Sequence, residues 1–391
     1  MADLKIFCEG IEEAALQQVR DLADFEAYKD SKIRIMPDAH AGIGCTIGTT
    51  MILKDKVTPN LVGVDIGCGM LVAELGRVTI DPKQLEEIIC NEIPSGMNVR
   101  ETPYDGGVPA KVLLDQLLCP AGKSEYNVLS LGTLGGGNHF IELDDDTEGN
   151  MYLVIHSGSR NLGKKVCEYY QRLAAKQRYE KGRGGVAELI ARLKAEGRER
   201  DIQAELRKLP KRLSDNDPLA YLEGKDFHDY LHDMDICQDY ATHNRLVMMG
   251  IITRALGVEP VSKWQTIHNY IDLHYMILRK GAISALAGER VIIPMNMRDG
   301  SLICIGKGNP DWNWSAPHGA GRLMSRADAF KTIQMNDFEK DMSGIASWSV
   351  CESTKDEAPG AYKPMDAIIA QIGPTVDVER IIRPVYNYKA H

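Results

Sequence analysis

Five residues of this chain have types and spacings that suit a metal site, and the first two are Asp65 and Cys68. They lie three residues apart in VGVDIGCGM, on either side of a glycine turn, so a carboxylate and a thiolate can converge on one ion. A buried cysteine in a tight turn explains this spacing equally well when it is considered alone.

A glycine-rich segment, LGTLGGGNHFIEL, places three glycines directly before Asn138 and His139, with Glu142 shortly after. Glycines let the backbone approach a ligand closely, so a phosphate or a metal ion fits here. The alternative is that these glycines only form the connection of a β-hairpin and bind no ligand. The histidine at the start of an apolar run favours the ligand interpretation.

Two further histidines follow apolar runs. VIHSGSR contains His156 with Arg160 in the next turn, and TIHNYI contains His268 beside Asn269. Each histidine alone is best explained as a hydrogen-bonded core residue. Together with Asp65, Cys68 and His139, however, the two histidines favour a metal site. Three imidazoles, a thiolate and a carboxylate suit Zn, Mn, Fe or Co, a shared thiolate can bridge two ions, and Arg160 is a candidate phosphate clamp.

His318 lies in SAPHGAGRLMSR, directly before glycines and an expected helix start near Arg322 and Arg326. A histidine in this setting can be a metal ligand, a general base or a covalent nucleophile in phosphoryl transfer, and the residues alone do not rank these roles. His40, in MPDAHAG, is an intermediate candidate. The remaining histidines have no third ligand or constellation around them: His228, His232, His243, His274 and His391.

The elements that must position these side chains follow from hydrophobic periodicity. LVGVDIGCG and MYLVIHSGSR predict buried strands that end at glycine, and ERVIIPM and SLICIG predict a later pair of strands. Helices are expected over 12–28, 82–93, 225–249 and 319–335, and a loop over 352–359. The charged, periodic stretch 178–215 predicts a peripheral helical insertion in one α+β domain spanning 1–391, with central sheets flanked by helices.

Composition excludes several classes of protein. A net charge of −9 over 391 residues argues against bulk electrostatic coating of nucleic acid, although local basic pairs such as Arg279 with Lys280 remain. Nine cysteines without framework spacing predict reduced thiols. We expect no membrane segment and a cytoplasmic location, because no apolar run is long enough to span a bilayer and the N-terminus lacks secretory features.

Taken in order, these motifs resemble the RtcB family of RNA ligases. The resemblance runs from about Ile35 to Lys389 and includes MPDAHAGIGCTIG, PNLVGVDIGCGM, LGTLGGGNHFIEL, HSGSRNLG, RKGAISALAG and HGAGRLMSR. It implies that an RNA 3′-phosphate, or a 2′,3′-cyclic phosphate after opening, is joined to a 5′-hydroxyl, in RNA repair or tRNA splicing, with GTP as co-substrate and two Mn²⁺ ions. An archease-type activator is a further partner that it suggests.

The resemblance also implies roles for individual residues. His318 would attack the α-phosphate of GTP to give a guanylylated histidine, the guanylyl group would pass to the RNA 3′-phosphate, and the 5′-hydroxyl would displace GMP. The implied metal ligands are Asp65, Cys68, His139, His156 and His268, with Cys68 bridging two ions. Asp38 matches an aspartate close to the nucleophile. Implied nucleotide contacts are Asn138, His139, Phe140, Ile141, Glu142, His268, Asn269, Pro294, Met295, Asn296, Met297, Ser301, His318, Gly319, Ala320, Gly321, Tyr362 and Lys389.

One segment departs from the family pattern. Many members have Pro-Gly-Ser-Met-Gly where this chain has Pro294, Met295, Asn296, Met297 and Arg298. Asn296 retains hydrogen-bonding groups, but the change indicates a divergent branch. Two other hypotheses therefore stand beside the ligase: a metal-dependent phosphoesterase that trims RNA ends, and a non-catalytic RNA-binding relative.

Overall fold

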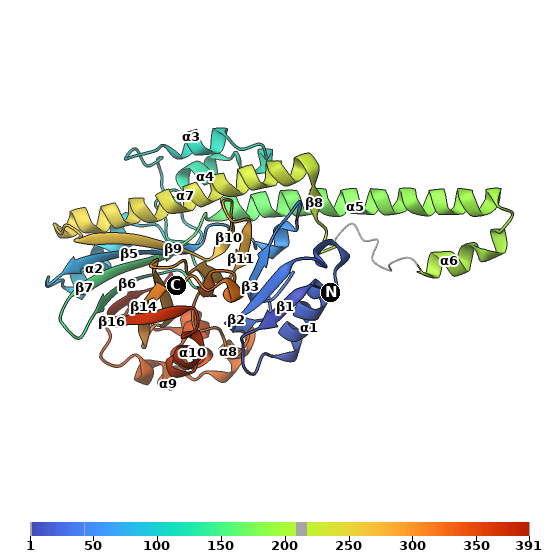
Figure 1. The fold of residues 1–391 in the computed structure, drawn as a ribbon. Helices are drawn as coiled ribbons and strands as arrows, with labels where there is room; N and C mark the ends of the chain where they lie inside the picture. The colour runs from blue at the N-terminus through green and yellow to red at the C-terminus, as the bar shows by residue number, and fades with distance from the viewer. Residues whose placement is uncertain (1, 43, 209–216, 391) are drawn as a thin grey trace.

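The computed structural model describes residues 2–42, 44–208 and 217–390 and contains both sheets and helices (Figure 1). Its largest element is a seven-stranded sheet with the strand order β13-β14-β16-β6-β7-β5-β9, in which every neighbouring pair is antiparallel. Its strands are β5 (Gly69–Gly76), β6 (Phe140–Asp145), β7 (Met151–Ser157), β9 (Ser262–Ile267), β13 (Arg290–Asn296), β14 (Gly300–Gly306) and β16 (Val376–Tyr388).

A second sheet has the order β1-β2-β3-β11-β10 and is antiparallel except for the β1–β2 pair. Two small sheets pair β12 with β15 and β4 with β8. The strands of these three sheets are β1 (Asp3–Ile6), β2 (Lys32–His40), β3 (Ile47–Ile52), β10 (Asn269–Asp272), β11 (Ile277–Lys280), β12 (Ala282–Ser284), β15 (Ser315–Pro317), β4 (Lys56–Val57) and β8 (Leu222–Glu223).

Helices surround both sheets. The α-helices are α1 (Glu13–Ala23), α2 (Pro82–Glu92), α3 (Ala110–Asp115), α4 (Glu125–Leu129), α5 (Asn161–Ala195), α6 (Ile202–Lys208), α7 (Gly224–Leu256), α8 (Arg326–Thr332), α9 (Met335–Asp341) and α10 (Met365–Ile372). Short 3-10 helices are η1 (Glu26–Tyr28), η2 (Pro59–Leu61), η3 (Pro120–Gly122), η4 (Glu199–Asp201), η5 (Pro310–Trp312), η6 (Glu352–Glu357) and η7 (Pro359–Ala361). None of the helices described is both long enough and apolar enough to cross a bilayer.

The two faces of the seven-stranded sheet are both buried, which explains its apolar strands. On one face, side chains such as Ile141 and Ile155 pack against α2 and α7. On the other face, Met70, Val154 and their neighbours pack against Ile292 of β13, Ile303 of β14 and Ile382 of β16. The sheet therefore curls onto itself, and β13 reaches β9: the Ile292 amide donates to Thr266 Oγ1 at 3.2 Å.

Several predicted elements are confirmed. The helix expected over 82–93 is α2, the one expected over 225–249 lies within α7, and the helix expected over 12–28 is α1 followed by η1. MYLVIHSGSR contributes β7, and ERVIIPM and SLICIG contribute the antiparallel pair β13 and β14. The mixed helix-and-sheet class is confirmed with them.

Three predicted elements are wrong. LVGVDIGCG does not form a strand: the segment is a 3-10 turn and irregular backbone whose Val62 and Ile66 are buried, and β5 begins at its last glycine. The helix expected over 319–335 begins only at Arg326, because Gly321 has a positive φ of 75°. The segment 352–359 is largely the 3-10 helix η6, and its Asp356 and Glu357 are buried.

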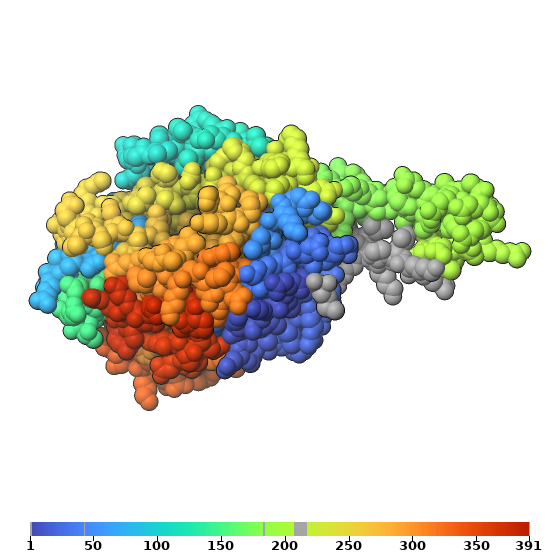
Figure 2. Space-filling view, viewed as in Figure 1, coloured from blue at the N-terminus to red at the C-terminus, as the bar shows by residue number. Residues whose placement is uncertain are grey.

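The C-terminal part of α5 and helix α6 form an arm that projects from the body (Figures 1 and 2). The N-terminal part of α5, which carries Leu162, Val166 and Tyr170, is buried in the core. Helix α5 runs without interruption from Asn161, so no break marks the predicted boundary at residue 178. The helical character expected for 178–215 is present up to Lys208, and residues 209–215 lie outside the described residues, as do Met1 and His391. That this arm is an insertion within one domain stays a prediction.

Candidate metal and nucleotide site

Four of the metal-ligand candidates meet at one edge of the seven-stranded sheet. Cys68 directly precedes β5, His139 directly precedes β6, and His268 directly follows β9. His156 lies next to the end of β7 and is paired in register with both Met70 of β5 and Phe140 of β6. Because the strands are antiparallel, starts and ends of neighbouring strands alternate along this edge and bring the four side chains together.

Close backbone packing requires glycine beside these side chains. A Cβ on Gly69 would lie 2.5 Å from the Thr266 carbonyl oxygen, and one on Gly158 would lie 2.2 Å from Asp65 Oδ1. Either contact is far inside van der Waals distance. These two glycines of the GCGM and HSGS motifs therefore give the carboxylate and the thiol their positions.

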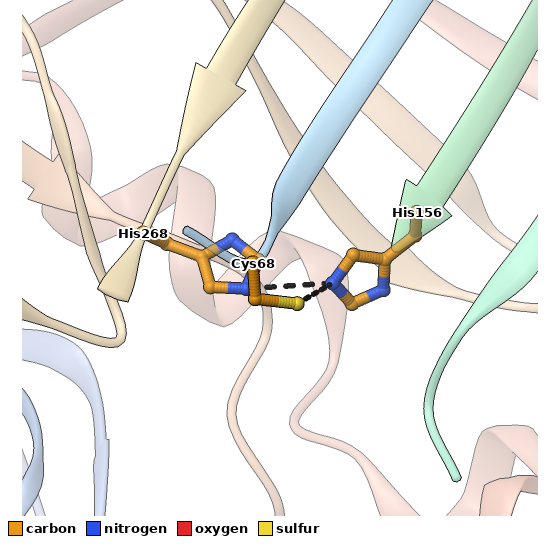
Figure 3. A group of neighbouring side chains, drawn as sticks. All are labelled: Cys68, His156 and His268. Carbon is orange, nitrogen blue, oxygen red and sulfur yellow. Dashed lines mark hydrogen bonds between the residues drawn. The ribbon is translucent and has the colours of Figure 1, made fainter. Parts of the chain in front are cut away.

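The donor atoms form two groups that share one sulfur. Cys68 Sγ lies 3.3 Å from His156 Nε2, which lies 3.4 Å from His268 Nε2 (Figure 3). Cys68 Sγ also lies 3.4 Å from His139 Nε2, which lies 3.0 Å from Asp65 Oδ2. The atoms of each group lie within 4.8 Å of one another. Ligands of a four-coordinate ion at about 2.0–2.1 Å are separated by about 3.3 Å, so this spacing suits metal coordination.

Hydrogen bonds orient the imidazoles toward the shared centre. His139 Nδ1 donates to the Leu134 carbonyl at 2.9 Å, and His156 Nδ1 donates to the Asn138 carbonyl at 3.1 Å. Since a carbonyl can only accept, each ring keeps its Nε2 for an ion. A lone pair on His139 Nε2 facing the Asp65 carboxylate at 3.0 Å needs a proton or a cation between the two atoms.

Burial determines the charge of these groups. It lowers the pKa values of His156 and His268 well below the usual range, so both rings are neutral and can act as ligands. Burial and the nearby Asp65 raise the pKa of the Cys68 thiol. His268 Nδ1 is buried without a hydrogen-bond partner among the described residues. A cation would favour the thiolate and offset the cost of burying it, so the donor set fits a metal ion.

His318 lies beside this cluster and is bonded to Asp38. It follows β15, and its ring centroid is 5.0 Å from that of His268. Its Nδ1 lies 2.6 Å from Asp38 Oδ2, which also accepts from the His318 amide at 3.1 Å. A Cβ on Gly321 would lie 2.3 Å from the Asp38 carbonyl oxygen, so this glycine lets the HGAG turn close over β2. The carboxylate holds a proton on Nδ1 and leaves the Nε2 lone pair for reaction.

A cavity of about 690 Å³ connects the two parts of the site, which is within the range of small-molecule sites. Most of the predicted nucleotide contacts line it. They are Asn138, Phe140, Glu142, His268, Asn269, Pro294, Met295, Asn296, Met297, His318, Gly319, Ala320, Gly321, Tyr362 and Lys389. Three predicted contacts do not line it: His139 and Ile141 lie behind its wall, and Ser301 is fully buried in β14.

Glu357 is a central residue of the cavity that the sequence did not reveal. Its carboxylate accepts from Lys389 Nζ at 3.0 Å, Arg326 at 2.6 Å and Tyr362 Oη at 2.7 Å. Burial opposes its charge, but Lys389 and Arg326 overcome this effect and lower its pKa. The buried Glu357 carboxylate therefore connects three side chains at the predicted guanine and lysine positions. The sequence predicted only a loop around Glu357.

Glu142 is shifted in the opposite direction from Glu357, because its pKa is raised. Its Oε1 accepts from Asn387 Nδ2 at 2.8 Å, and burial raises its pKa to about 8, although Lys389 opposes the shift. A carboxyl group that is protonated near neutral pH can donate a hydrogen bond to a ligand. Its place at the sheet edge follows from β6, which pairs with the end of β16.

The divergent segment satisfies its own polar groups. Asn296 Oδ1 accepts from the amides of Arg298 and Asp299, at 3.0 and 2.9 Å, and its Nδ2 donates to Asp299 at 2.8 Å. Met295 and Met297 are buried against separate clusters. The amide of Asn296 thus stabilises the β13–β14 turn instead of facing the cavity with free hydrogen-bonding groups.

Two arginines considered as phosphate contacts lie elsewhere. Arg160 has a φ of 60° at the start of α5 and donates to Thr133 Oγ1 and the Gly96 carbonyl, so it supports the glycine-rich loop from outside the cavity. Arg279 is fully buried and bonded to Ser315 and Tyr270. Lys280, its neighbour, does line the cavity.

The chain is thus a mixed helix-and-sheet protein in which two overlapping groups of possible metal donors lie beside a carboxylate-bonded histidine. The family described as tRNA-splicing ligase RtcB matches residues 18–115 and 115–390. The chain belongs to the RtcB family.

Individual relatives agree with this assignment. RNA-splicing ligase RtcB of Escherichia coli K12 is 32% identical, with 99% of this chain and 97% of the relative covered. RNA-splicing ligase RtcB1 of another Escherichia coli strain has the same identity and coverage. The tRNA-splicing ligase RtcB of Aeropyrum pernix is 26% identical, with 96% and 91% covered. The family relationship supports a ligase that acts on RNA.

Proposed function

We propose that this protein is a GTP- and manganese-dependent ligase that joins RNA 3′-phosphate or 2′,3′-cyclic phosphate ends to 5′-hydroxyl ends. The observation that carries the proposal is the single thiol of Cys68 shared by two donor groups, next to a histidine whose Nδ1 is bonded to a carboxylate. A hydrolase that only trims phosphates has no need of such a histidine. RNA repair and tRNA splicing are the proposed contexts, and an archease-type activator is a proposed partner.

Two Mn²⁺ ions would be held by Asp65, Cys68, His139, His156 and His268, with Cys68 in both groups. When bound, they would neutralise triphosphate charge and align the reacting oxygens. Neutral imidazoles, a carboxylate and one thiolate are acceptable ligands for manganese.

His318 would act as the nucleophile. Asp38 fixes the tautomer that carries its proton on Nδ1, so the Nε2 lone pair can attack the α-phosphate of GTP and release pyrophosphate. A 2′,3′-cyclic end would first be hydrolysed by water to a 3′-phosphate. The resulting guanylylated histidine would transfer the guanylyl group to the RNA 3′-phosphate. Attack by the 5′-hydroxyl would then form the phosphodiester and release GMP.

The nucleotide would occupy the cavity against Tyr362, Lys389 and the Glu357 network. Lys389 Nζ is 3.0 Å from Glu357 and 5.3 Å from the Phe140 ring centroid, which fixes its charge near the wall that carries Asn138 and Glu142. This charge supports the lysine as a phosphate contact.

Incubation of the protein with Mn²⁺ and α-labelled GTP tests the proposal. Wild type should acquire an acid-labile label, and His318→Asn should acquire none, while His274→Asn, a change in an exposed turn, should label like wild type. Absence of label on wild type, or equal label on the His318 variant, would contradict the mechanism. RNA ends that are trimmed but never joined would favour the phosphoesterase.

A further inference from the structure

His40 lines the same cavity as His318 and has no role in the chemistry described so far. It is the last residue of β2, where it pairs with Ile47 of β3. Asp38, the hydrogen-bond partner of His318, lies two residues earlier on the same strand, in the stretch where the β2–β3 register shifts. The strand that carries the partner of the nucleophile thus also carries a second imidazole toward the cavity.

The backbone of Asp38 fixes the tautomer of His40. His40 Nδ1 lies 3.0 Å from the Asp38 carbonyl oxygen, which can only accept, so the ring proton is on Nδ1 and Nε2 carries the lone pair. The side chain of Asp38 bonds to His318 Nδ1. One residue therefore orients two histidines, and each is left with an unprotonated Nε2.

The surroundings keep His40 neutral at physiological pH. Burial lowers the pKa of His40, and the charges of His318 and Lys363 act in the same direction, while Asp38 opposes them through its carbonyl and its charge. Lys363 Nζ is held on the Pro37 carbonyl at 3.0 Å. Glu12, on the other side, is bonded to the Ala41 amide at 2.7 Å. A neutral imidazole with a free lone pair in a cavity is suited to accept a proton.

We propose that His40 is the catalytic base of the joining step and that its Nε2 removes the proton from the RNA 5′-hydroxyl. The inference rests on the proposed ligase function and adds to it the residue that activates the second RNA end. The 5′-oxygen forms its bond to the 3′-phosphorus as the bond from that phosphorus to the guanylate oxygen breaks. The hydroxyl proton goes to His40 Nε2, and GMP leaves with the electron pair of the broken bond.

His40→Asn is the sharpest variant. Its side-chain NH₂ occupies roughly the place of Nδ1 and can still donate to the Asp38 carbonyl, but nothing replaces Nε2. His40→Gln places an amide near the Nε2 position and serves as a second variant if His40→Asn does not fold. His274→Asn is the matched control, because it makes the same change in the exposed turn between β10 and β11.

Single-turnover reactions with Mn²⁺, GTP, a labelled 3′-phosphate RNA and a 5′-hydroxyl RNA separate the steps. We expect the two His40 variants to form guanylylated protein and RNA 3′-guanylate within a few-fold of wild type. Joining should slow by about 10²–10⁴-fold, so that RNA 3′-guanylate accumulates. The joining rate of wild type should rise with pH to a plateau as His40 loses its proton, and the plateau should be absent from both variants.

Two results would overturn the role of His40. Joining at the wild-type rate would show that no base acts from this position. Equal losses of guanylylation and joining would show that His40 only positions Asp38 and His318. A wild-type protein that forms no guanylylated intermediate would instead overturn the ligase proposal and the His40 role together, so the two failures are distinguishable.

Discussion

The seven-stranded sheet and the segments that face it position side chains by different means. At the sheet edge, hydrogen-bonded register places Cys68, His139, His156 and His268, and each lies within one residue of a strand end. Across the cavity, Glu357 lies on a 3-10 helix, and Asn296 is the last residue of β13, where its side chain closes the β13–β14 turn. Side-chain hydrogen bonds hold both residues. A regular register tolerates little change, whereas a turn can exchange residues if it keeps its own hydrogen bonds. The departure from the family pattern spans the β13–β14 turn and the end of β13, where the register shifts.

The largest effect is expected from the sheet edge. Cys68→Ser removes the atom common to both donor groups, so bound manganese should fall to one ion per chain or fewer and guanylylation should fall more than about 10²-fold, beyond the loss typical of outer-shell changes. Metal analysis after gel filtration and the labelling assay measure both. Cys90→Ser, a change of an exposed thiol, is the control. Unchanged metal content in Cys68→Ser would show that the shared thiol is not a ligand.

Asp38→Asn tests whether the orientation of His318 can be changed without affecting the metal site at the sheet edge. The substitution removes the carboxylate that holds the proton on His318 Nδ1, and guanylylation should slow by about 10²–10⁴-fold while metal content stays at the wild-type level. Asp55→Asn, at an exposed site, should have no effect on either measurement. Loss of metal from Asp38→Asn would mean that the metal site depends on the Asp38–His318 contact.

Glu357→Gln removes the buried counter-charge of Lys389, whereas Arg326 keeps its ion pair with the buried Asp356. The free energy of unfolding at neutral pH should fall by about 3–5 kcal/mol, as is typical when one partner of a buried pair is removed. Because folding lowers the pKa of this carboxyl, its contribution is complete above the unfolded value of about 4.3 and is lost as pH falls through the folded value.

The difference in stability between wild type and Glu357→Gln should therefore narrow only below about pH 4.3. Urea unfolding at several pH values measures it. Glu352→Gln, on the exposed side of the same 3-10 helix, is the control and should change stability little. An equal loss in both variants would contradict the importance of the Glu357 network.

The smallest effect is expected from the turn. Asn296→Ala removes hydrogen bonds within the turn and should lower the free energy of unfolding by about 1–2 kcal/mol. Because the Asn296 amide is bonded to Arg298 and Asp299, GTP affinity and the preference for GTP over ATP should change less than about 3-fold, below 1 kcal/mol. Calorimetric titration with each nucleotide tests this. A large loss of preference would show that Asn296 reads the base.

The sequence predicted much of the sheet edge because polar residues next to β-branched runs and glycines mark strand ends. It misassigned LVGVDIGCG because an apolar segment can be buried without joining a sheet, as Val62 and Ile66 are. It also placed the start of a helix at Gly319, where the positive φ of Gly321 is not helical and α8 begins only at Arg326.

The sequence did not reveal Glu357, since its partners Arg326 and Lys389 are about 30 residues away on either side and only the fold brings them together. A charged run has the same appearance whether it faces solvent or a buried cation. Nor did the sequence show that the side chain of Asn296 forms its hydrogen bonds within the β13–β14 turn. Contacts of this kind depend on tertiary structure and have no local signature.

His268 is the single residue between β9 of the large sheet and β10 of the smaller one. Its amide donates to the Cys68 carbonyl, and its own carbonyl accepts from Gly281. The residue that connects the two sheets is thus also a candidate ligand, and hydrogen bonds fix its backbone on both sides. Any ion that binds His268 would also fasten the sheets together, so metal loading should raise the melting temperature as well as support chemistry. By the same reasoning, one residue inserted between β9 and β10 would change how the two sheets are aligned with each other.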